Sequence, residues 1–171
     1  MNFLRFLIIF FLITSSAKSE NNIPVKYIDI SRIVNDSVVG KKIKEVIMSD
    51  RKKLNDKHSN LEKKLEKQKN EILAKKNILS DEEFKNEVGK HQESVSKYQL
   101  QRKQDLEKMS QKNIKLSRNF MIKVDKIVIE YSKKNSIDLL LKKDALIVSN
   151  SSLDITNDIL TEVNKNIKKI D

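Results

Sequence analysis

The sequence predicts an α+β fold, in which a small body of β-strands carries a long antiparallel coiled-coil hairpin of two α-helices. Residues 41–120 contain one glycine, no proline and no cysteine, and they are rich in Lys, Glu, Gln, Asn and Leu, a composition typical of long helices. Short runs of β-forming residues lie on both sides of this stretch, at 25–30, 137–141 and 145–148. The middle of the chain is therefore expected to form the arm, and its two ends the body.

The apolar residues of the arm form a thin stripe on each predicted helix, as expected for a helix with a single partner helix. In the first helix they recur in steps of seven or four, at Ile47, Leu54, Leu61, Leu65, Ile72 and Leu79. In the second helix they are Phe84, Val88, Val95, Tyr98, Leu106, Met109 and Ile114. One antiparallel register places Ile72 opposite Val88, Leu65 opposite Val95, Leu61 opposite Tyr98 and Leu54 opposite Leu106. This single register predicts a hairpin rather than one continuous helix.

The turn of the hairpin is predicted near residues 77–80. Ser80 is followed three residues later by Glu83, the spacing of a capping box that opens a new helix. The acidic run at 81–83 is then better explained by the helix dipole than by a cation site. At about 1.5 Å per residue the first helix reaches roughly 55 Å, so that the arm must project from the body.

The N-terminal part of the body begins with the alternating segment 25–30, which predicts a strand and is preceded by Pro24. Ser31 is placed to cap a short helical turn. Gly40 is expected to mark the beginning of the long helix near Lys41. This part of the chain therefore leads directly from a strand into the arm.

The C-terminal part of the body follows the returning helix, which is expected to end near Asn135. The apolar runs at 137–141 and 145–148, joined by a polar turn, predict a β-hairpin. A final amphipathic helix follows, capped by Asp154 or Thr156. Its apolar face consists of Ile155, Ile159, Val163 and Ile167. Such a body is too small to be stable alone, so oligomerisation is expected.

Residues 1–19 have the features of a cleaved secretory signal. A basic Arg5 precedes an apolar run at 6–13, and the small residues Ala17 and Ser19 have the spacing of a signal-peptidase site. A membrane anchor is the alternative, but the run is much shorter than the roughly 20 residues that span a bilayer. We therefore expect a signal peptide at residues 1–19. Residues 20–40 and 121–171 are expected to form the body, and residues 41–120 the arm.

The net charge of the chain is +11, and most of this excess lies on the arm. Residues 41–120 contain 22 basic and 13 acidic residues, a difference of +9. A long positive arm attracts acidic unfolded chains or anionic lipid surfaces, with a strength that falls as salt rises. Nucleic acid is a poorer partner because the arm lacks interleaved aromatic residues. The candidate binding residues are lysines and apolar residues away from the seam: Met48, Lys63, Lys64, Lys67, Leu73, Lys75, Lys76, Ile78 and Leu100.

Sequence motifs of enzymes are missing from the chain. It contains no glycine-rich phosphate loop, no Gly-x-Ser-x-Gly, no His-Glu-x-x-His and no cysteine. Its two histidines, His58 and His91, are the only candidates for an imidazole metal ligand. In the predicted register His58 faces Arg102, and His91 lies roughly 15 Å away along the arm. We therefore predict no enzyme activity, no cofactor and no metal site.

The order of these parts and several stretches of sequence resemble the Skp (OmpH-like) family of periplasmic chaperones. The resemblance is carried by YIDISRIVNDSVVGKK at 27–42, LSDEEF at 79–84 and, above all, IDLLLKKDALIVSNSSLDITNDILTEVNK at 137–165. It implies a homotrimer whose strands form a small β-barrel, with three helical hairpins around a cavity. It also implies a holdase that binds unfolded outer-membrane proteins in this cavity without ATP. Lipopolysaccharide binding is proposed for the arms of the family, but no residue here is matched to it.

A structural coiled-coil adaptor of the cell envelope is the alternative function. Such an adaptor would bridge envelope components through the tip of the hairpin, and would carry a defined binding motif there. Residues 77–80 instead have the sequence of a capped turn. The holdase is therefore the favoured function.

Overall fold

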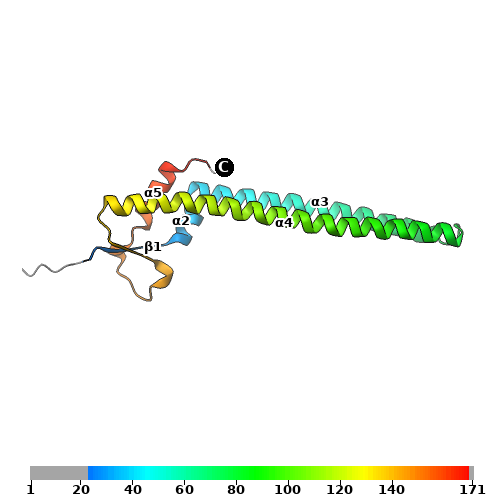
Figure 1. The fold of residues 1–171 in the computed structure, drawn as a ribbon, viewed down its shortest axis with the longest axis horizontal. Coiled ribbons are helices and arrows are strands. Elements are labelled where there is room, and N and C mark those ends of the chain that lie inside the picture. The colour runs from blue at the N-terminus through cyan, green and yellow to red at the C-terminus, as the bar shows by residue number, and fades with distance from the viewer. Residues whose placement is uncertain (1–22, 170–171) are drawn as a thin grey trace, which may run out of the picture.

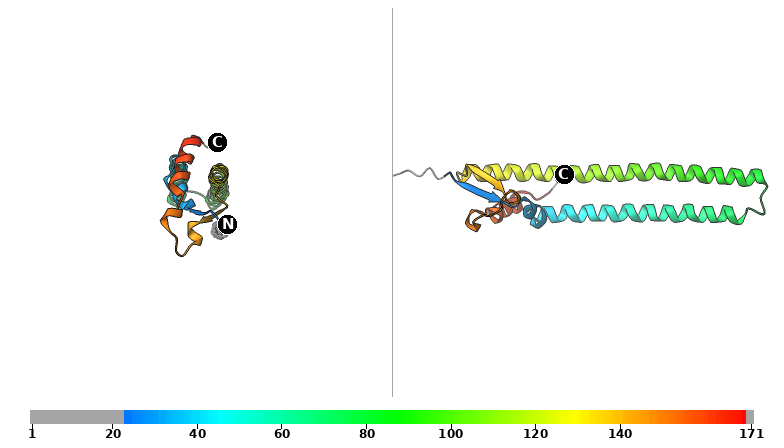
Figure 2. Two further views of the ribbon diagram at one scale, coloured as in Figure 1. Left: turned by 90° about the vertical axis from the view of Figure 1, so that its left-hand side faces the viewer. Right: turned by 90° about the horizontal axis from the view of Figure 1, so that it is seen from below.

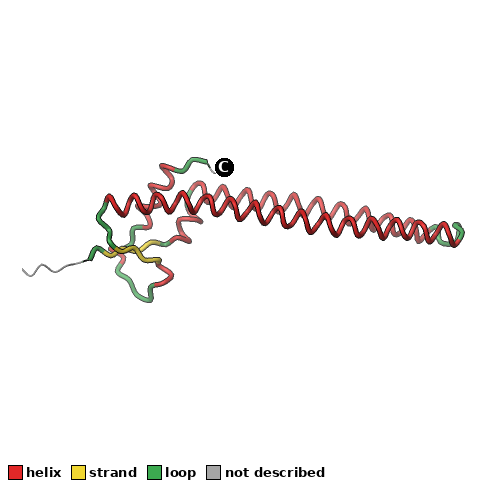
Figure 3. Tube along the Cα trace, viewed as in Figure 1, coloured by secondary structure: helices red, strands yellow, loops and turns green. Residues whose placement is uncertain are grey.

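The structure, a computed structural model, describes residues 23–169, so that the predicted signal peptide at 1–19 lies outside the described residues. Two antiparallel helices form a long arm that projects from a small body (Figure 1). They are α3 (Val38–Ala74) and α4 (Asp81–Lys134), which lie side by side along the arm in Figures 1 and 2. The body contains β1 (Val25–Ile28), α2 (Ile30–Asp36), β2 (Leu139–Lys142), α5 (Thr156–Asn166) and the 3-10 turns η1 (Lys143–Ala145) and η2 (Ser151–Leu153). Helix dominates the described chain, as Figure 3 shows.

The sheet of the body has two strands within the described residues, β1 and β2, which pair in parallel. Val25 pairs with Leu139 at one end of this ladder. Parallel strands need a connection that crosses from one end of the sheet to the other, and the whole arm together with α2 serves as that connection. On its other side β1 makes an isolated bridge from Tyr27 to Asp154. The fold is thus mostly helical, with a small parallel sheet.

The predicted β-hairpin between 137–141 and 145–148 is wrong. After β2 the chain forms the turn η1, in which the Leu146 N–H donates to the Lys143 carbonyl at 3.1 Å. Ile147 and Val148 then follow without regular structure, and their side chains are 102% and 89% exposed. The turn lacks the glycine or asparagine that a tight hairpin favours, so the chain after β2 does not fold back along it.

The short helix α2 is capped by Asp29, rather than by Ser31 as predicted. The Asp29 carboxylate accepts the Arg32 N–H at 2.8 Å and lies 3.3 Å from the Lys143 ammonium. The hydrogen bond from the Arg32 N–H, followed by that from Lys143, lowers the pKa of Asp29. The Asp29 side chain thereby connects the start of α2 to η1.

Gly40 lies inside the first turn of α3, and not at its beginning as predicted. Ser37 caps this helix, because its hydroxyl accepts the Gly40 N–H at 3.1 Å, and the helix begins at Val38 rather than near Lys41. A Cβ atom on Gly40 would come within 1.9 Å of the Val34 carbonyl oxygen. Glycine is therefore required for the close approach of α2 and α3.

The hydrophobic core lies where the C-terminal part of α4 passes through the body. Phe120 and Val124 of α4 are 1% and 0% exposed, and they belong to one buried cluster with Ile33 of α2. The predicted apolar face of α5 is confirmed and completes this core. It consists of Ile155, Ile159, Val163 and Ile167, none of which is more than 5% exposed. These contacts hold the arm onto the body.

The polar start of α5 links the two ends of the chain. Thr156 is fully buried, and its hydroxyl accepts the Asp29 N–H at 2.9 Å. The Asp154 carboxylate accepts the Thr156 N–H at 2.8 Å and also the Thr156 hydroxyl. The N-cap position itself is Ile155, which provides no side-chain cap, so the predicted capping by Asp154 or Thr156 is wrong. The Thr156 hydroxyl instead ties α5 to the segment between β1 and α2, and the Asp154 carboxylate accepts both of its hydrogen bonds from Thr156.

We expect the two glycines of the chain to respond in opposite directions to alanine. Gly40→Ala places a methyl group against the main chain of α2, and should lower the free energy of unfolding by about 1–3 kcal/mol or more. Gly89→Ala adds a methyl group to α4 where nothing lies within 4 Å, and should raise the free energy of unfolding by about 0.5–1 kcal/mol. Urea denaturation followed by circular dichroism measures both changes. Equal effects of the two substitutions would contradict the tight packing at Gly40.

Candidate binding surface on the helical arm

The tip of the arm is a turn closed by the first residues of α4. The Ser80 hydroxyl accepts the Glu83 N–H at 3.3 Å, and the Glu83 carboxylate accepts the Ser80 N–H at 3.0 Å. The predicted capping box is thus confirmed. Hydrogen bonds from the Ser80 hydroxyl and the Ser80 N–H lower the pKa of Glu83. The acidic run at 81–83 therefore stabilises the helix terminus.

Three ion pairs of lysine or arginine join α3 to α4 in the described chain. The nitrogen–oxygen distances are 2.5 Å for Lys112–Asp50, 2.5 Å for Lys57–Asp105 and 2.7 Å for Arg102–Glu62. The hydrogen bond from Lys57 is the largest cause of a lowered pKa of Asp105. Such exposed pairs add little stability individually, but a slip of the helices by one turn would break all three. They therefore help to fix the antiparallel register.

His58 is a buried polar residue in the seam between the two helices. It is 5% exposed, its ring lies edge-on to Tyr98 with the centroids 5.6 Å apart, and its Nε2 lies 3.5 Å from a carboxylate oxygen of Asp105. Tyr98 and Asp105 lie one turn on either side of Arg102, the predicted neighbour of His58, which agrees with the predicted register. His91 is half-buried elsewhere along α4. Among residues 23–169, no group of three possible metal ligands is formed.

The four apolar candidate residues are exposed and are spread over the whole arm. Their exposed fractions are 63% for Met48, 51% for Leu73, 81% for Ile78 and 58% for Leu100. Met48 lies in the first third of α3, whereas Ile78 lies at the tip. These residues do not form one pocket but isolated apolar contacts on a polar surface. Although the helices are long, none in the described range is apolar enough to cross a membrane.

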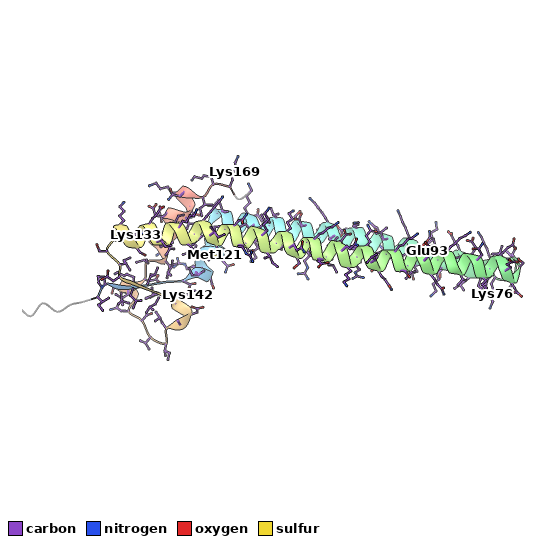
Figure 4. All side chains as sticks on the ribbon, in the orientation of Figure 1. Lys76, Glu93, Met121, Lys133, Lys142 and Lys169 are labelled. Carbon is purple, nitrogen blue, oxygen red and sulfur yellow. The ribbon has the colours of Figure 1, made fainter. Side chains whose placement is uncertain are left out.

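The five candidate lysines are also exposed. They lie in the outer half of α3 and at the tip, and they are Lys63, Lys64, Lys67, Lys75 and Lys76. Figure 4 shows Lys76 at the far end of the arm. Of the five, Lys67 alone has an ion pair in the described chain, at 3.8 Å from Glu71. Residues 63–94, which form the outer arm and its tip, contain eight lysines and seven acidic residues, so that most of the basic excess of the arm lies nearer the body.

Two residues predicted for the seam lie largely outside it. Leu106 is 43% exposed and Ile114 is 55% exposed. The seam position next to Leu106 is taken by Asp105, whose carboxylate reaches across to Lys57. Polar pairing across the arm thus displaces an apolar residue that the spacing had placed in contact with α3.

A second apolar face of α4, which was not predicted, lies next to the body. Ile122 and Ile129 are 47% and 53% exposed, whereas Phe120 and Val124 on the same helix are buried. The seven-residue spacing of Ile122 and Ile129, out of phase with the buried pair, is the sequence signal that marks this face. One isolated chain therefore leaves apolar surface uncovered on its body.

Comparison with protein families covers both the body and the arm. A family model described as "Outer membrane protein (OmpH-like)" matches residues 24–163. The chain belongs to the OmpH-like family. The resemblance indicated by the sequence is thereby confirmed.

A solved structure supports the OmpH-like fold. It is the crystal structure of a protein from Caulobacter crescentus proposed to be an outer membrane chaperone (OmpH-like). The two structures agree with a TM-score of 0.81 over 86% of this chain and 88% of that chain, at 16% sequence identity. At this identity the likeness shows the shared fold. A search of curated proteins finds no match to the chain.

The seam predicts which engineered cysteines should form a disulfide in this cysteine-free OmpH-like chain. Leu65→Cys with Val95→Cys should crosslink within one chain, because a disulfide needs Cα atoms within about 7 Å. The matched control is Leu65→Cys with Leu100→Cys. This pair should not form a disulfide, because Leu100 is 58% exposed and lies outside the seam. Non-reducing electrophoresis of dilute oxidised protein measures both. Crosslinking of the control pair alone would show that the register is wrong.

Proposed function

We propose that this OmpH-like protein is an ATP-independent holdase chaperone of the periplasm. In this proposal it binds unfolded outer-membrane proteins in a cavity between helical arms and prevents their aggregation. The observation that carries the proposal is the arm, whose basic excess and isolated exposed apolar side chains lie outside its seam. Weak contacts distributed over a long surface suit an unfolded chain, which presents many short charged and apolar segments but no fixed shape. The arm residues given above as candidates are the proposed client contacts.

The proposed cavity requires more than one copy of the chain. We infer a homotrimer with a small β-barrel body, in which residues 145–148 pair as a strand with the sheet of a neighbouring copy. Two strands within one chain are too few for a stable sheet, and Ile147 and Val148 beside them are almost fully exposed. Pairing between copies would cover these side chains and satisfy the unpaired strand edges.

The proposed location and division of the chain rest on its sequence. Residues 1–19 are assigned to a cleaved signal peptide, residues 20–40 and 121–171 to the trimerisation body, and residues 41–120 to the arm. An exported chain without cysteine can fold in an oxidising compartment without forming disulfides. The positive arm also suits contact with lipopolysaccharide or an anionic lipid surface.

A structural adaptor of the cell envelope is the second candidate function. The observation in its favour is the 81% exposure of Ile78, which lies at the tip of the arm next to Lys75 and Lys76. An adaptor would bind a folded partner through this one point, whereas a holdase would use the length of the arm. An aggregation assay with an unfolded client therefore distinguishes the holdase from the adaptor.

The holdase proposal predicts that the purified protein suppresses aggregation of an outer-membrane β-barrel diluted out of urea, without nucleotide. Light scattering measures the aggregation, and suppression should be complete at about one trimer per client. Capture should slow as salt rises, because screening shortens the reach of the arm's field to about 8 Å at physiological ionic strength. Unchanged aggregation at every protein ratio and salt concentration would reject the holdase and favour the adaptor.

The five candidate lysines provide the matched test of this mechanism. Neutralising Lys63, Lys64, Lys67, Lys75 and Lys76 together to glutamine should leave the helical content unchanged, since these side chains are exposed. The same change should slow capture of the client and make it less sensitive to salt. The control replaces the same five lysines by arginine, which keeps the charge and should keep the capture rate. Equal capture by both variants would remove these lysines from the proposed site.

The proposed trimer predicts that the loop after β2 controls assembly. Ile147→Asp with Val148→Asp should leave the fold of one chain intact, because both side chains are exposed, but should shift the protein from trimer to monomer. The control, Leu73→Asp with Ile78→Asp, makes the same change on the arm and should leave the trimer intact. Light scattering at micromolar concentration measures the mass. A wild-type protein that is monomeric in this experiment would refute the assembly.

A further inference from the structure

A pocket lies at the base of the arm, away from the candidate client contacts. Its volume is about 280 Å³, and it is open to solvent on one side and lined by the first turns of α3, by α4 and by the C-terminal segment after α5. Four of its lining residues are apolar: Val39, Ile43, Val46 and Leu116. The others are three lysines: Lys42, Lys168 and Lys169. Figure 4 shows Lys169 beside the start of the arm.

The C-terminal wall of the pocket is held in place by several contacts. Ile167 is 5% exposed in the core, and its N–H donates to the Val163 carbonyl at 2.9 Å. The Lys123 ammonium on α4 donates to the Lys169 carbonyl at 3.0 Å. The segment after α5 is thus fastened at both of its described ends. The pocket is therefore part of the built structure and not a gap beside a loose chain end.

The charge around the pocket has no acidic partner among the described residues. None of Lys42, Lys168 and Lys169 has a carboxylate within ion-pair distance among residues 23–169, and the Lys168 ammonium instead donates to the Asn164 carbonyl at 2.9 Å. Several lysines further along the arm, in contrast, do have carboxylate partners, such as Lys57 and Lys112. An apolar cavity bordered by three ammonium groups that have no carboxylate partner in the described part of the chain is complementary to a molecule with an apolar body and an anionic head.

We propose that this pocket binds a single-chain anionic amphiphile, namely a long-chain carboxylate whose alkyl chain enters the apolar cavity. Its carboxylate would then form charge-assisted hydrogen bonds with the ammonium groups of Lys42, Lys168 and Lys169. A free inorganic anion would contact the three ammonium groups but leave the apolar part of the lining uncovered, and no lining residue is aromatic, as stacking on a nucleobase would require. A volume near the lower end of ordinary ligand pockets suits one alkyl chain rather than a large lipid with several chains.

The proposal predicts a dependence on chain length in isothermal titration calorimetry of the full-length protein. Octanoate, decanoate and dodecanoate are the probes, each below its micelle concentration. Affinity should rise about 4-fold for each buried methylene, until the alkyl chain fills the cavity. Decanol has the same chain without the charge, and should bind at least about 10-fold more weakly than decanoate. Equal binding of decanol and decanoate would overturn the role of the lysines, and the lack of any heat of binding for the three carboxylates would overturn the site.

Lysine-to-glutamine variants test whether decanoate binds at this pocket. Replacing Lys42, Lys168 and Lys169 together by glutamine should weaken decanoate binding at least about 10-fold. The control replaces Lys63, Lys64 and Lys67 by glutamine, which changes the net charge equally and should leave the affinity unchanged. Equal weakening by both variants would show general attraction to a positive surface and not a site. Circular dichroism verifies that each variant is folded.

A blocking substitution and a spin label complete the test. Val46 is 37% exposed at the pocket, so that Val46→Trp can fill the cavity from its open side and should abolish decanoate binding. A fatty acid with a nitroxide on its chain should broaden the NMR signals of Val39 and Leu116 before those of Leu100 on the outer arm. Broadening along the whole arm, with the signals at the pocket unaffected, would overturn the proposal even if Val46→Trp proved to be unfolded.

Discussion

The packing of Phe120 and Val124 against α2 and α5 is the contact on which the rest of the structure depends. Between residues 41 and 119, His58 is the only residue that is buried, so the two arm helices hold each other through a half-buried seam. A narrow seam of this kind determines the position of a helix along its partner only weakly. The buried cluster at the base fixes the position of α4, and the pairs along the arm then keep the same register toward the tip.

The polar residues of the seam contribute specificity more than stability. Asp105 faces both Lys57 and His58, and Glu62 accepts hydrogen bonds from Tyr98 at 2.5 Å and from Arg102 at 2.7 Å. Exposed pairs such as these stabilise a fold by a few tenths of a kcal/mol each, on the order of the thermal energy. They define a single arrangement because any shift separates several of them at once. The arm can therefore remain ordered while leaving apolar side chains free on its surface.

Local signals in the sequence predicted the elements whose structure is decided locally. The capping box at Ser80, the end of the return helix near Asn135 and the apolar face of α5 depend on residues close together in the chain, and all are found. The pairing of the strands depends on residues far apart, and a short apolar run does not reveal its neighbour. For this reason the parallel pairing of β1 with β2 was missed, and a strand was expected at 145–148.

The same distinction applies to the candidate sites. The exposure of Met48 and Leu100 could be predicted because both lie outside the apolar stripe of their own helix. The exposure of Leu106 could not, because it depends on the attraction between Asp105 and Lys57 across the arm. The pocket at the base combines α3, α4 and the segment after α5, which are distant in sequence. No single stretch of the chain contains enough of it to be recognised.

The parallel pairing of β1 with β2 also determines the order in which the chain can fold. Val25 pairs with Leu139, and the whole arm lies between these two residues in the sequence. During synthesis Val25 therefore has no partner strand until the arm has been made. A chain synthesised from its N-terminus can close the helical hairpin early, because the contacts around the tip are local and form quickly. The sheet can form only after β2 has been made, and the core around Phe120 is completed only when α5 follows. An unfinished chain therefore has an arm but no finished body, so that any surface formed by the sheet exists only on complete molecules.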